Sequence, residues 1–142
     1  PVKTSVEGLD DLIKDIEKRQ VAEKLLPLLP WGWHEEIIYF TQNEFTNRVM
    51  LDGVPTEVSE EELNGKYNAD GHGYKAVDGR MLKGCDHLAA FVEAYLSTEY
   101  GITSKHLLNG MADLREKYKN KTIAGINFGA VYDEFPELKT NL

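Results

Sequence analysis

Residues 78–101 read DGRMLKGCDHLAAFVEAYLSTEYG, the longest uninterrupted helical pattern in this sequence of 142 residues. Apolar residues recur in it at the i, i+3, i+4 and i+7 spacing that is typical of one buried helix face. They are Met81, Leu82, Cys85, Leu88, Ala89, Val92 and Leu96. Asp78 is a suitable N-cap, and Gly101 suits the position just after the last turn. The stretch therefore predicts a long core helix, with Cys85 as a buried and unreactive thiol.

Asp86 lies at the edge of this apolar stripe, with small Ala89 and Ala90 one turn beyond it. A carboxylate at the rim of a core helix is costly to bury unless something pairs with it. The residues alone leave three partners open: a metal ion, a lysine or arginine, or a set of hydrogen-bond donors. Lys83, one turn earlier, can balance the charge of Asp86 or contact a phosphate group. His87 points about 100° away around the helix, so we expect it in polar packing or at the surface.

The run from Leu82 to Ala94, LKGCDHLAAFVEA, resembles the helix that carries the last metal-ligand aspartate of HD-superfamily phosphohydrolases. The branch that it resembles most is the one related to bacterial 5′-deoxynucleotidases. The metal site of that superfamily follows the order His, His-Asp, Asp, and Asp86 matches the final Asp. The opening Pro1-Val2-Lys3 resembles the segment that follows the His-Asp helix. The resemblance thus covers most of this chain and the later part of the family's domain.

This resemblance implies a metal-dependent phosphohydrolase that acts on a nucleotide or a related phosphomonoester. Asp86 would be a metal ligand, and Lys3 and Lys83 would contact the phosphate of the substrate. The divalent ion would be Mn, Co, Zn, Fe or Mg, because imidazole and carboxylate ligands together accept borderline and hard ions. Homodimers are common in the family, so the resemblance also implies a homo-oligomer.

The histidines depart from the family's pattern. The sequence has four, none of which is followed by Asp: His34, His72, His87 and His106. The resemblance therefore places the first His and the His-Asp pair upstream of Pro1, with this chain as the C-terminal portion of an HD domain. We expect the chain alone to lack catalysis, because one aspartate cannot retain the ion. The alternative interpretation is a non-catalytic helical binding or oligomerisation module, in which Asp86 is a paired core residue and no metal is bound.

Composition limits the class of protein further. The net charge of −8 argues against nucleic acid or an anionic membrane surface as the main partner. The same charge suits a protein that binds metal cations, although most acidic residues are simply solvated at the surface. A single cysteine excludes an internal disulfide framework and favours a reducing, cytoplasmic setting. The apolar runs are shorter than a membrane span, and the length suits one domain over residues 1–142.

The remaining sequence favours an all-α, HD-domain-like helical bundle with a small β-hairpin. Ser5 is a candidate N-cap for a helix that runs to about Lys24. We expect the leucines of LLPLLP, residues 25–30, to be buried and Trp31 and Trp33 to anchor the following turn to the core. Further helices are expected over 34–42, 105–118 and 123–135. The Asp52-Gly53 turn signal predicts the hairpin within residues 48–58.

Overall fold

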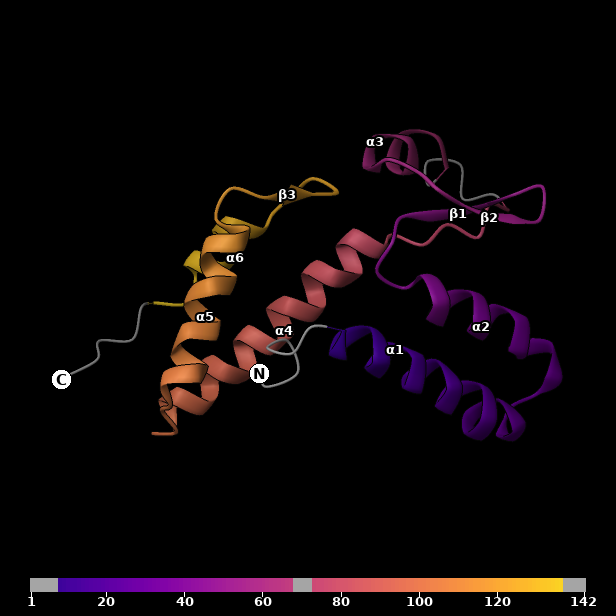
Figure 1. Ribbon diagram of the computed structural model, residues 1–142. Helices are drawn as coiled ribbons and strands as arrows, with labels where there is room; N and C mark the ends of the chain where they lie inside the picture. The colour runs from indigo at the N-terminus through magenta and orange to yellow at the C-terminus, as the bar shows by residue number, and fades with distance from the viewer. Residues whose placement is uncertain (1–7, 68–72, 137–142) are drawn as a thin grey trace. The chain divides into compact units, whose positions relative to one another are not determined.

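The computed structural model describes residues 8–67 and 73–136, which fold mainly as α-helices with two small antiparallel strand pairs (Figure 1). The predicted all-α class with a small hairpin is confirmed. The chain forms two compact units, Pro1–Gly79 and Arg80–Leu142, and each is described by itself. Lys3, Ser5 and His72 lie outside the described residues. Within the described ranges, no helix has the length and apolar character to cross a membrane.

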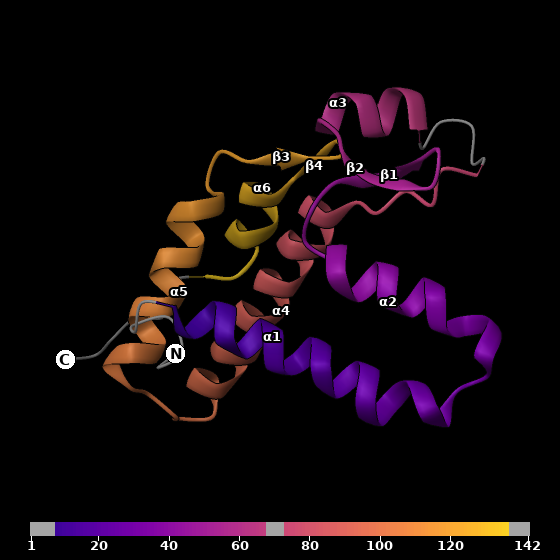
Figure 2. The same cartoon turned by 45° about the vertical axis from the view of Figure 1, so that its right-hand side comes forward.

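The first unit begins with a helical hairpin, whose arms are α1 (Leu9–Gln20) and α2 (His34–Asn43) (Figures 1 and 2). A π-helical turn, Val21–Leu25, extends α1, and two 3-10 turns complete the connection, Leu26–Leu28 and Trp31–Trp33. The helix predicted over 34–42 is confirmed. Pro27 and Pro30 end the first arm, because proline removes a backbone donor and restricts the residue before it.

Two expectations for this connection are wrong. Of its leucines only Leu26 is buried, and Leu28 is 81% exposed. Trp31 and Trp33 do not anchor the turn to a core, since they are 85% and 58% exposed. The tight turns around the two prolines leave these side chains exposed to solvent.

The rest of the first unit is built on the predicted hairpin, with strands β1 (Arg48–Leu51) and β2 (Val54–Glu57). Asp52 and Gly53 form its turn, both with positive φ, as the sequence signal requires. The short helix α3 (Glu60–Glu62) follows, and Ser59 and Glu62 form a capping box at its start. A π-helical turn, Leu63–Tyr67, packs on β1. Val49, Leu63 and Tyr67 make the core of this unit.

The second unit contains α4 (Gly79–Glu99), α5 (Lys105–Tyr118) and α6 (Phe128–Asp133). The predicted end of α4 is confirmed: Gly101 has φ 82°, and its N–H donates to the carbonyl of Thr98. The N–H of Ile102 donates to the carbonyl of Ser97, which completes a Schellman motif. Ser104 caps α5 by accepting a hydrogen bond from the N–H of Leu107.

An aromatic core holds the second unit together. Its buried members are Phe91, Tyr95, Met111, Tyr118, Ile123, Phe128 and Tyr132. The buried face of α4 is therefore centred on Phe91 and Tyr95. It is rotated from the predicted stripe by one residue position, or about 100° around the helix axis. Cys85 is exposed, which corrects the expectation of a buried thiol, and Leu82 and Leu96 are exposed with it. The aromatic rings of the chain's last third determined this rotation.

The predicted helix over 123–135 is also wrong in its first part. Strands β3 (Thr122–Ile123) and β4 (Ile126–Asn127) pair there, and only α6 is helical. The two-residue turn between them, Ala124-Gly125, has φ values of 47° and 78°. Alanine is not a turn signal, because its Cβ disfavours this left-handed backbone.

Replacing Ala124 with glycine is expected to stabilise the chain by about 0.5–1 kcal/mol. Glycine removes the left-handed strain, and the larger entropy of the unfolded chain offsets only part of this gain. Urea denaturation of the variant measures the effect. Gly125→Ala is the matched control and should lower the stability instead. An added Cβ there meets nothing within 4 Å, so only the positive φ opposes it. A loss of stability in Ala124→Gly would contradict this account of the turn.

Candidate metal-ligand site

Asp86 lies on the exposed side of α4, with its side chain 53% accessible to solvent. The expectation that its carboxylate sits at the rim of a core is therefore corrected, because the rotation of α4 turns this position outward. The carboxylate Oδ2 accepts a hydrogen bond from Lys83 Nζ at 3.0 Å, one turn earlier on the helix. Of the partners that the sequence left open, the described residues provide this lysine.

Lys83 thus has a definite position, beside the candidate ligand. An exposed pair at i, i+3 stabilises a helix only slightly, so the ammonium can move to another anion at little cost. Its predicted contact with substrate phosphate stays a prediction. The same prediction for Lys3 falls on a residue outside the described ranges.

The surface of α4 around Asp86 combines small, apolar and acidic side chains. Cys85, Ala89 and Ala90 are exposed, as are Leu82 and Leu96 further along the helix. Glu93 is exposed too, two turns beyond Asp86 on the same face, or about 10 Å along the axis. The described part of the second unit packs on the opposite, aromatic side of α4, so Asp86 projects from a face that this core does not use.

His87, the neighbour of Asp86, belongs to the packing between α4 and α5. Its Nδ1 is joined to the hydroxyl of Tyr118 by a 2.7 Å hydrogen bond, and the two rings meet edge to face. Burial lowers the pKa of His87, and the charges of Lys117 and Lys83 lower it further. Burial likewise raises the pKa of the Tyr118 phenol. Both groups are therefore neutral near pH 7, which agrees with the polar packing expected from the sequence.

We expect Tyr118→Phe to destabilise the chain by about 0.5–1.5 kcal/mol, since it deletes this hydrogen bond but keeps the buried ring. Urea denaturation followed by far-UV circular dichroism gives the value. Tyr100→Phe is the control, because Tyr100 is 84% exposed and loses only a solvated hydroxyl. Equal stability of Tyr118→Phe and the unchanged chain would show that the contact with His87 contributes nothing.

Arg115 is a second polar anchor of this unit, and no sequence pattern pointed to it. Its guanidinium donates to the backbone carbonyls of Tyr132 and Phe135 and lies 4.8 Å from the ring centroid of Phe91. The three partners are 17 to 24 positions away in sequence, so no local pattern reveals the contact. Arg115 links α5 to the end of α6 and has a structural role.

The described residues do not complete a metal site. A divalent ion in a protein takes four or more donor atoms, and Asp86 offers one carboxylate. Residues 8–67 and 73–136 contain no group of three His, Cys, Asp or Glu side chains placed to hold an ion. His34 bonds instead to the carbonyl of Leu29, and His106 is exposed in the first turn of α5. Asp86 is thus a single candidate ligand among the described residues, and its role as a metal ligand stays a prediction.

Comparison with known proteins identifies the domain. Neither the curated proteins nor the solved structures include a match to this chain. A family model described as "HD domain" matches residues 3–115, a range that includes Asp86 and most of α5. HD domains generally bind divalent metal ions, and their superfamily is one of metal-dependent phosphohydrolases. The match covers most of the sequence, and the chain belongs to the HD domain family.

Proposed function

We propose that this chain supplies Asp86 as the last metal-ligand aspartate of a phosphohydrolase that acts on a nucleotide or a related phosphomonoester. The observation that carries the proposal is the family match across α4, together with an exposed carboxylate at the position that resembles the family's final Asp. The finer assignment, to the branch related to 5′-deoxynucleotidases, rests on the resemblance of residues 82–94.

The surroundings of Asp86 support this role. The exposed Leu82, Cys85 and Leu96 give α4 an apolar surface beside the carboxylate, of the kind that packs against another helix. Ala89 and Ala90 add little bulk, so a helix packed there can approach closely. We infer that such a helix brings the His and His-Asp ligands, which are absent from this sequence as motifs.

A bound metal ion would act as a Lewis acid and would lower the pKa of a water molecule that it coordinates. The residues of this chain have other tasks. Asp86 contributes a negative charge from its position on a regular helix, and the Lys83 ammonium lies 3.0 Å from that carboxylate. Lys83 can then exchange this contact for one with the phosphate of the substrate. A cytoplasmic location and a homo-oligomeric state belong to the same proposal.

The test is hydrolysis of deoxynucleoside 5′-monophosphates with and without added Mn, Co, Zn, Fe or Mg. A polypeptide that joins these 142 residues to the His and His-Asp ligands is expected to release phosphate only with a divalent ion. The 142 residues alone are expected to release none above background. Metal-dependent turnover by the shorter chain would contradict the proposal that its ligand set is incomplete.

The second candidate is a non-catalytic helical interaction module. The observation in its favour is the 3.0 Å ion pair of Asp86 with Lys83, which accounts for the charge without a metal. The two candidates differ in metal content: the module binds no divalent ion even when the His and His-Asp ligands are supplied.

A further inference from the structure

A group of lysines lies around the hydrogen-bonded pair of His87 and Tyr118, beside the candidate metal ligand. The ammonium groups of Lys117 and Lys121 lie 5.8 and 5.9 Å from the ring centroid of Tyr118. Beyond the effect of burial, the charges of Lys117 and Lys83 lower the pKa of His87, which places both lysines near its ring. The pair itself is neutral near pH 7, so ammonium groups from α4 and α5 lie around a patch that has no charge of its own.

The backbone holds the two lysines of α5 in defined positions. Lys117 belongs to the last turn of the helix, next to the buried Tyr118. Lys121 follows the helix: its N–H donates to the carbonyl of Tyr118, and its carbonyl accepts a hydrogen bond from the N–H of Phe128. A base in a last helical turn also offsets the helix dipole. That effect accounts for Lys117, whereas Lys121 lies beyond the helix and still reaches the same ring.

The acids of the last two turns of α5 do not pair with these lysines. Glu116 lies 3.8 Å from Lys119 instead. Asp113 lies one turn before Lys117, but neither Lys117 nor Lys121 forms an ion pair with any residue that the structure describes. The end of α5 therefore keeps a local surplus of positive charge, in a chain whose net charge is −8.

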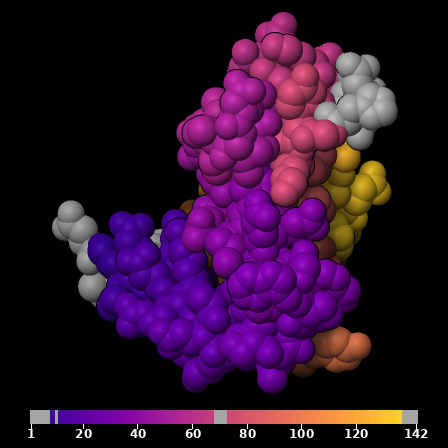
Figure 3. All heavy atoms as spheres, turned by 90° about the vertical axis from the view of Figure 1, so that its right-hand side faces the viewer, coloured from indigo at the N-terminus to yellow at the C-terminus, as the bar shows by residue number. Residues whose placement is uncertain are grey.

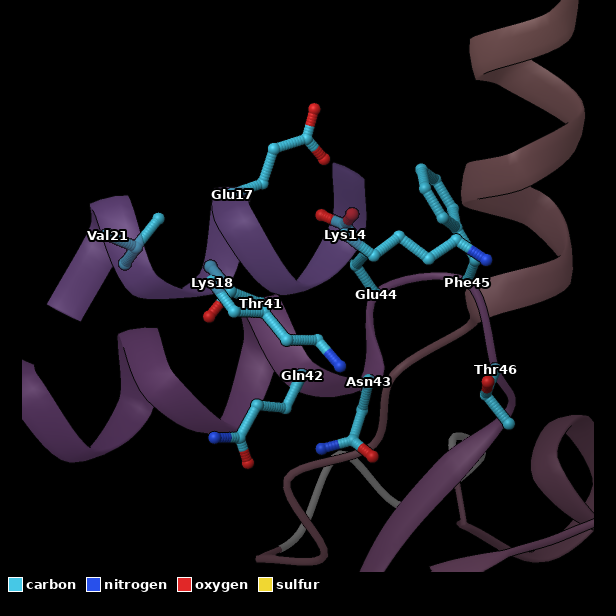
Figure 4. Close-up of a pocket in the computed structure, with 10 residues that line it drawn as sticks. All are labelled: Lys14, Glu17, Lys18, Val21, Thr41, Gln42, Asn43, Glu44, Phe45 and Thr46. Carbon is cyan, nitrogen blue, oxygen red and sulfur yellow. The ribbon is translucent and has the colours of Figure 1, made fainter. Parts of the chain in front are cut away.

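The hollow of the first unit lacks such a surplus. It has a volume of about 360 Å³ and lies between α1 and the end of α2, whose indigo and purple atoms face the viewer in Figure 3. Figure 4 shows the lining residues, in which Lys14 and Lys18 are accompanied by Glu17 and Glu44. Equal numbers of acids and bases give no net attraction for an anion. Of these two surfaces, the end of α5 is the one that selects a negatively charged group.

An anionic substrate meets unfavourable charge near Asp86. The chain is acidic overall, and Glu93 lies on the same face of α4. Nearby ammonium groups offset this repulsion and raise the local concentration of an anionic ligand. Lys83 contacts Asp86 directly, at 3.0 Å, so the two lysines at the end of α5 are available for a further anionic group.

We propose that Lys117 and Lys121 bind a second phosphate group of the substrate, apart from the one that is hydrolysed at Asp86. Since the two lysines lie at the end of α5 and Asp86 lies on α4, the class of substrate is a nucleotide with phosphate groups at two separate positions. Each lysine acts as a point charge on the phosphate oxygens. The proposal rests on the proposed function of Asp86, but binding of phosphate by the two lysines needs no metal.

Binding of inorganic phosphate to the 142-residue chain tests the lysine site without metal or catalysis. Two-dimensional NMR spectra of the isotope-labelled chain follow each backbone amide as phosphate is added. The amides of Tyr118 and Lys121 are expected to shift and to reach saturation. Lys117→Gln with Lys121→Gln is expected to weaken binding at least about 10-fold, because both charge-assisted contacts are lost.

Lys24→Gln with Lys105→Gln is the matched control for this titration. It removes the same charge from two exposed lysines elsewhere in the chain, and the affinity for phosphate should not change. The same spectra verify that each variant is folded. Amides at the end of α5 that do not respond to phosphate, or an equal loss of affinity in both double variants, would overturn the proposal.

Catalysis tests whether the bound phosphate belongs to the substrate. The polypeptide that joins this chain to the His and His-Asp ligands is expected to have a higher kcat/KM for a deoxynucleoside 3′,5′-bisphosphate than for the 5′-monophosphate. Lys117→Gln with Lys121→Gln is expected to reduce this preference at least about 10-fold through KM, because a phosphate remote from the reaction contributes uniform binding. Lys24→Gln with Lys105→Gln should retain it.

The two experiments separate this proposal from the proposed function. If the variant loses phosphate binding but keeps the preference for the bisphosphate, the lysines hold a free anion and the second-phosphate assignment is overturned. If the joined polypeptide hydrolyses no nucleotide while phosphate binding still depends on the two lysines, the proposed function has failed. The second-phosphate assignment then fails with it, and the phosphate site at the end of α5 stands.

Discussion

Phe91→Ala is expected to destabilise the second unit by about 3–5 kcal/mol, the usual cost of truncating a buried phenylalanine. Phe91 is fully buried, and its ring lies at the centre of the aromatic core. Tyr132 and Phe135 meet it edge to face, with centroids 4.8 and 5.6 Å away, and the guanidinium of Arg115 lies over the ring. The variant removes all of these contacts together and leaves a cavity between α4, α5 and α6.

Such a loss is comparable to the whole stability of many domains, so α4 and α5 of Phe91→Ala should lose most of their amide protection in hydrogen exchange. Leu96→Ala is the control on the same helix, since Leu96 is 46% exposed and lies outside the buried core, so its truncation should cost under about 1 kcal/mol. If Phe91→Ala and Leu96→Ala were equally stable, the buried face of α4 would not be the one described.

Asp86→Ala is expected to reduce metal-dependent phosphate release by more than about 100-fold in a polypeptide that also carries the His and His-Asp ligands. Loss of residues that only support a metal ligand already costs about 10–100-fold, and Asp86 is proposed as a ligand itself. The fold should survive, because the variant removes only an exposed ion pair with Lys83. Initial rates with a deoxynucleoside monophosphate at saturating metal measure the effect.

Glu93→Ala is the matched control for this measurement. Glu93 is an exposed carboxylate two turns along the same face of α4, so it changes the charge equally without touching the proposed ligand. It should keep most of the activity. An equal loss in both variants would indicate a general charge effect of this face, and would contradict a specific role for Asp86.

The end of α4 and the start of α5 were predictable from the sequence because they depend on local chemistry. Ser104 caps α5 through a hydrogen bond to a residue three positions away, and Gly101 ends α4 by adopting a left-handed backbone. The Asp52-Gly53 hairpin is local in the same way. In each case the deciding contacts lie within five residues, so the sequence contains the whole signal.

The buried side of α4 and the surroundings of Asp86 could not be predicted in this way. Leucine and alanine periodicity favoured one side of α4, but the rings of Tyr118, Phe128 and Tyr132 pack against the side with Phe91. Those partners are distant in sequence, and α4 has apolar residues on both sides. Periodicity therefore identified the helix but placed Asp86 at the rim of a core, and the position is exposed. The strand pair at Thr122–Asn127 was missed because Ala124 occupies a backbone conformation that alanine seldom adopts.

The central claim is that Asp86 is a metal ligand, and metal content tests it most directly. The protein to measure is the polypeptide that joins this chain to the His and His-Asp ligands, with and without Asp86→Ala. Its metal content after gel filtration is measured by elemental mass spectrometry. The account predicts about one divalent ion per chain in the unchanged protein and in Glu93→Ala, and an ion largely lost in Asp86→Ala. Equal metal content in all three proteins would show that Asp86 is not a ligand. No metal in any of them would instead favour the non-catalytic helical module.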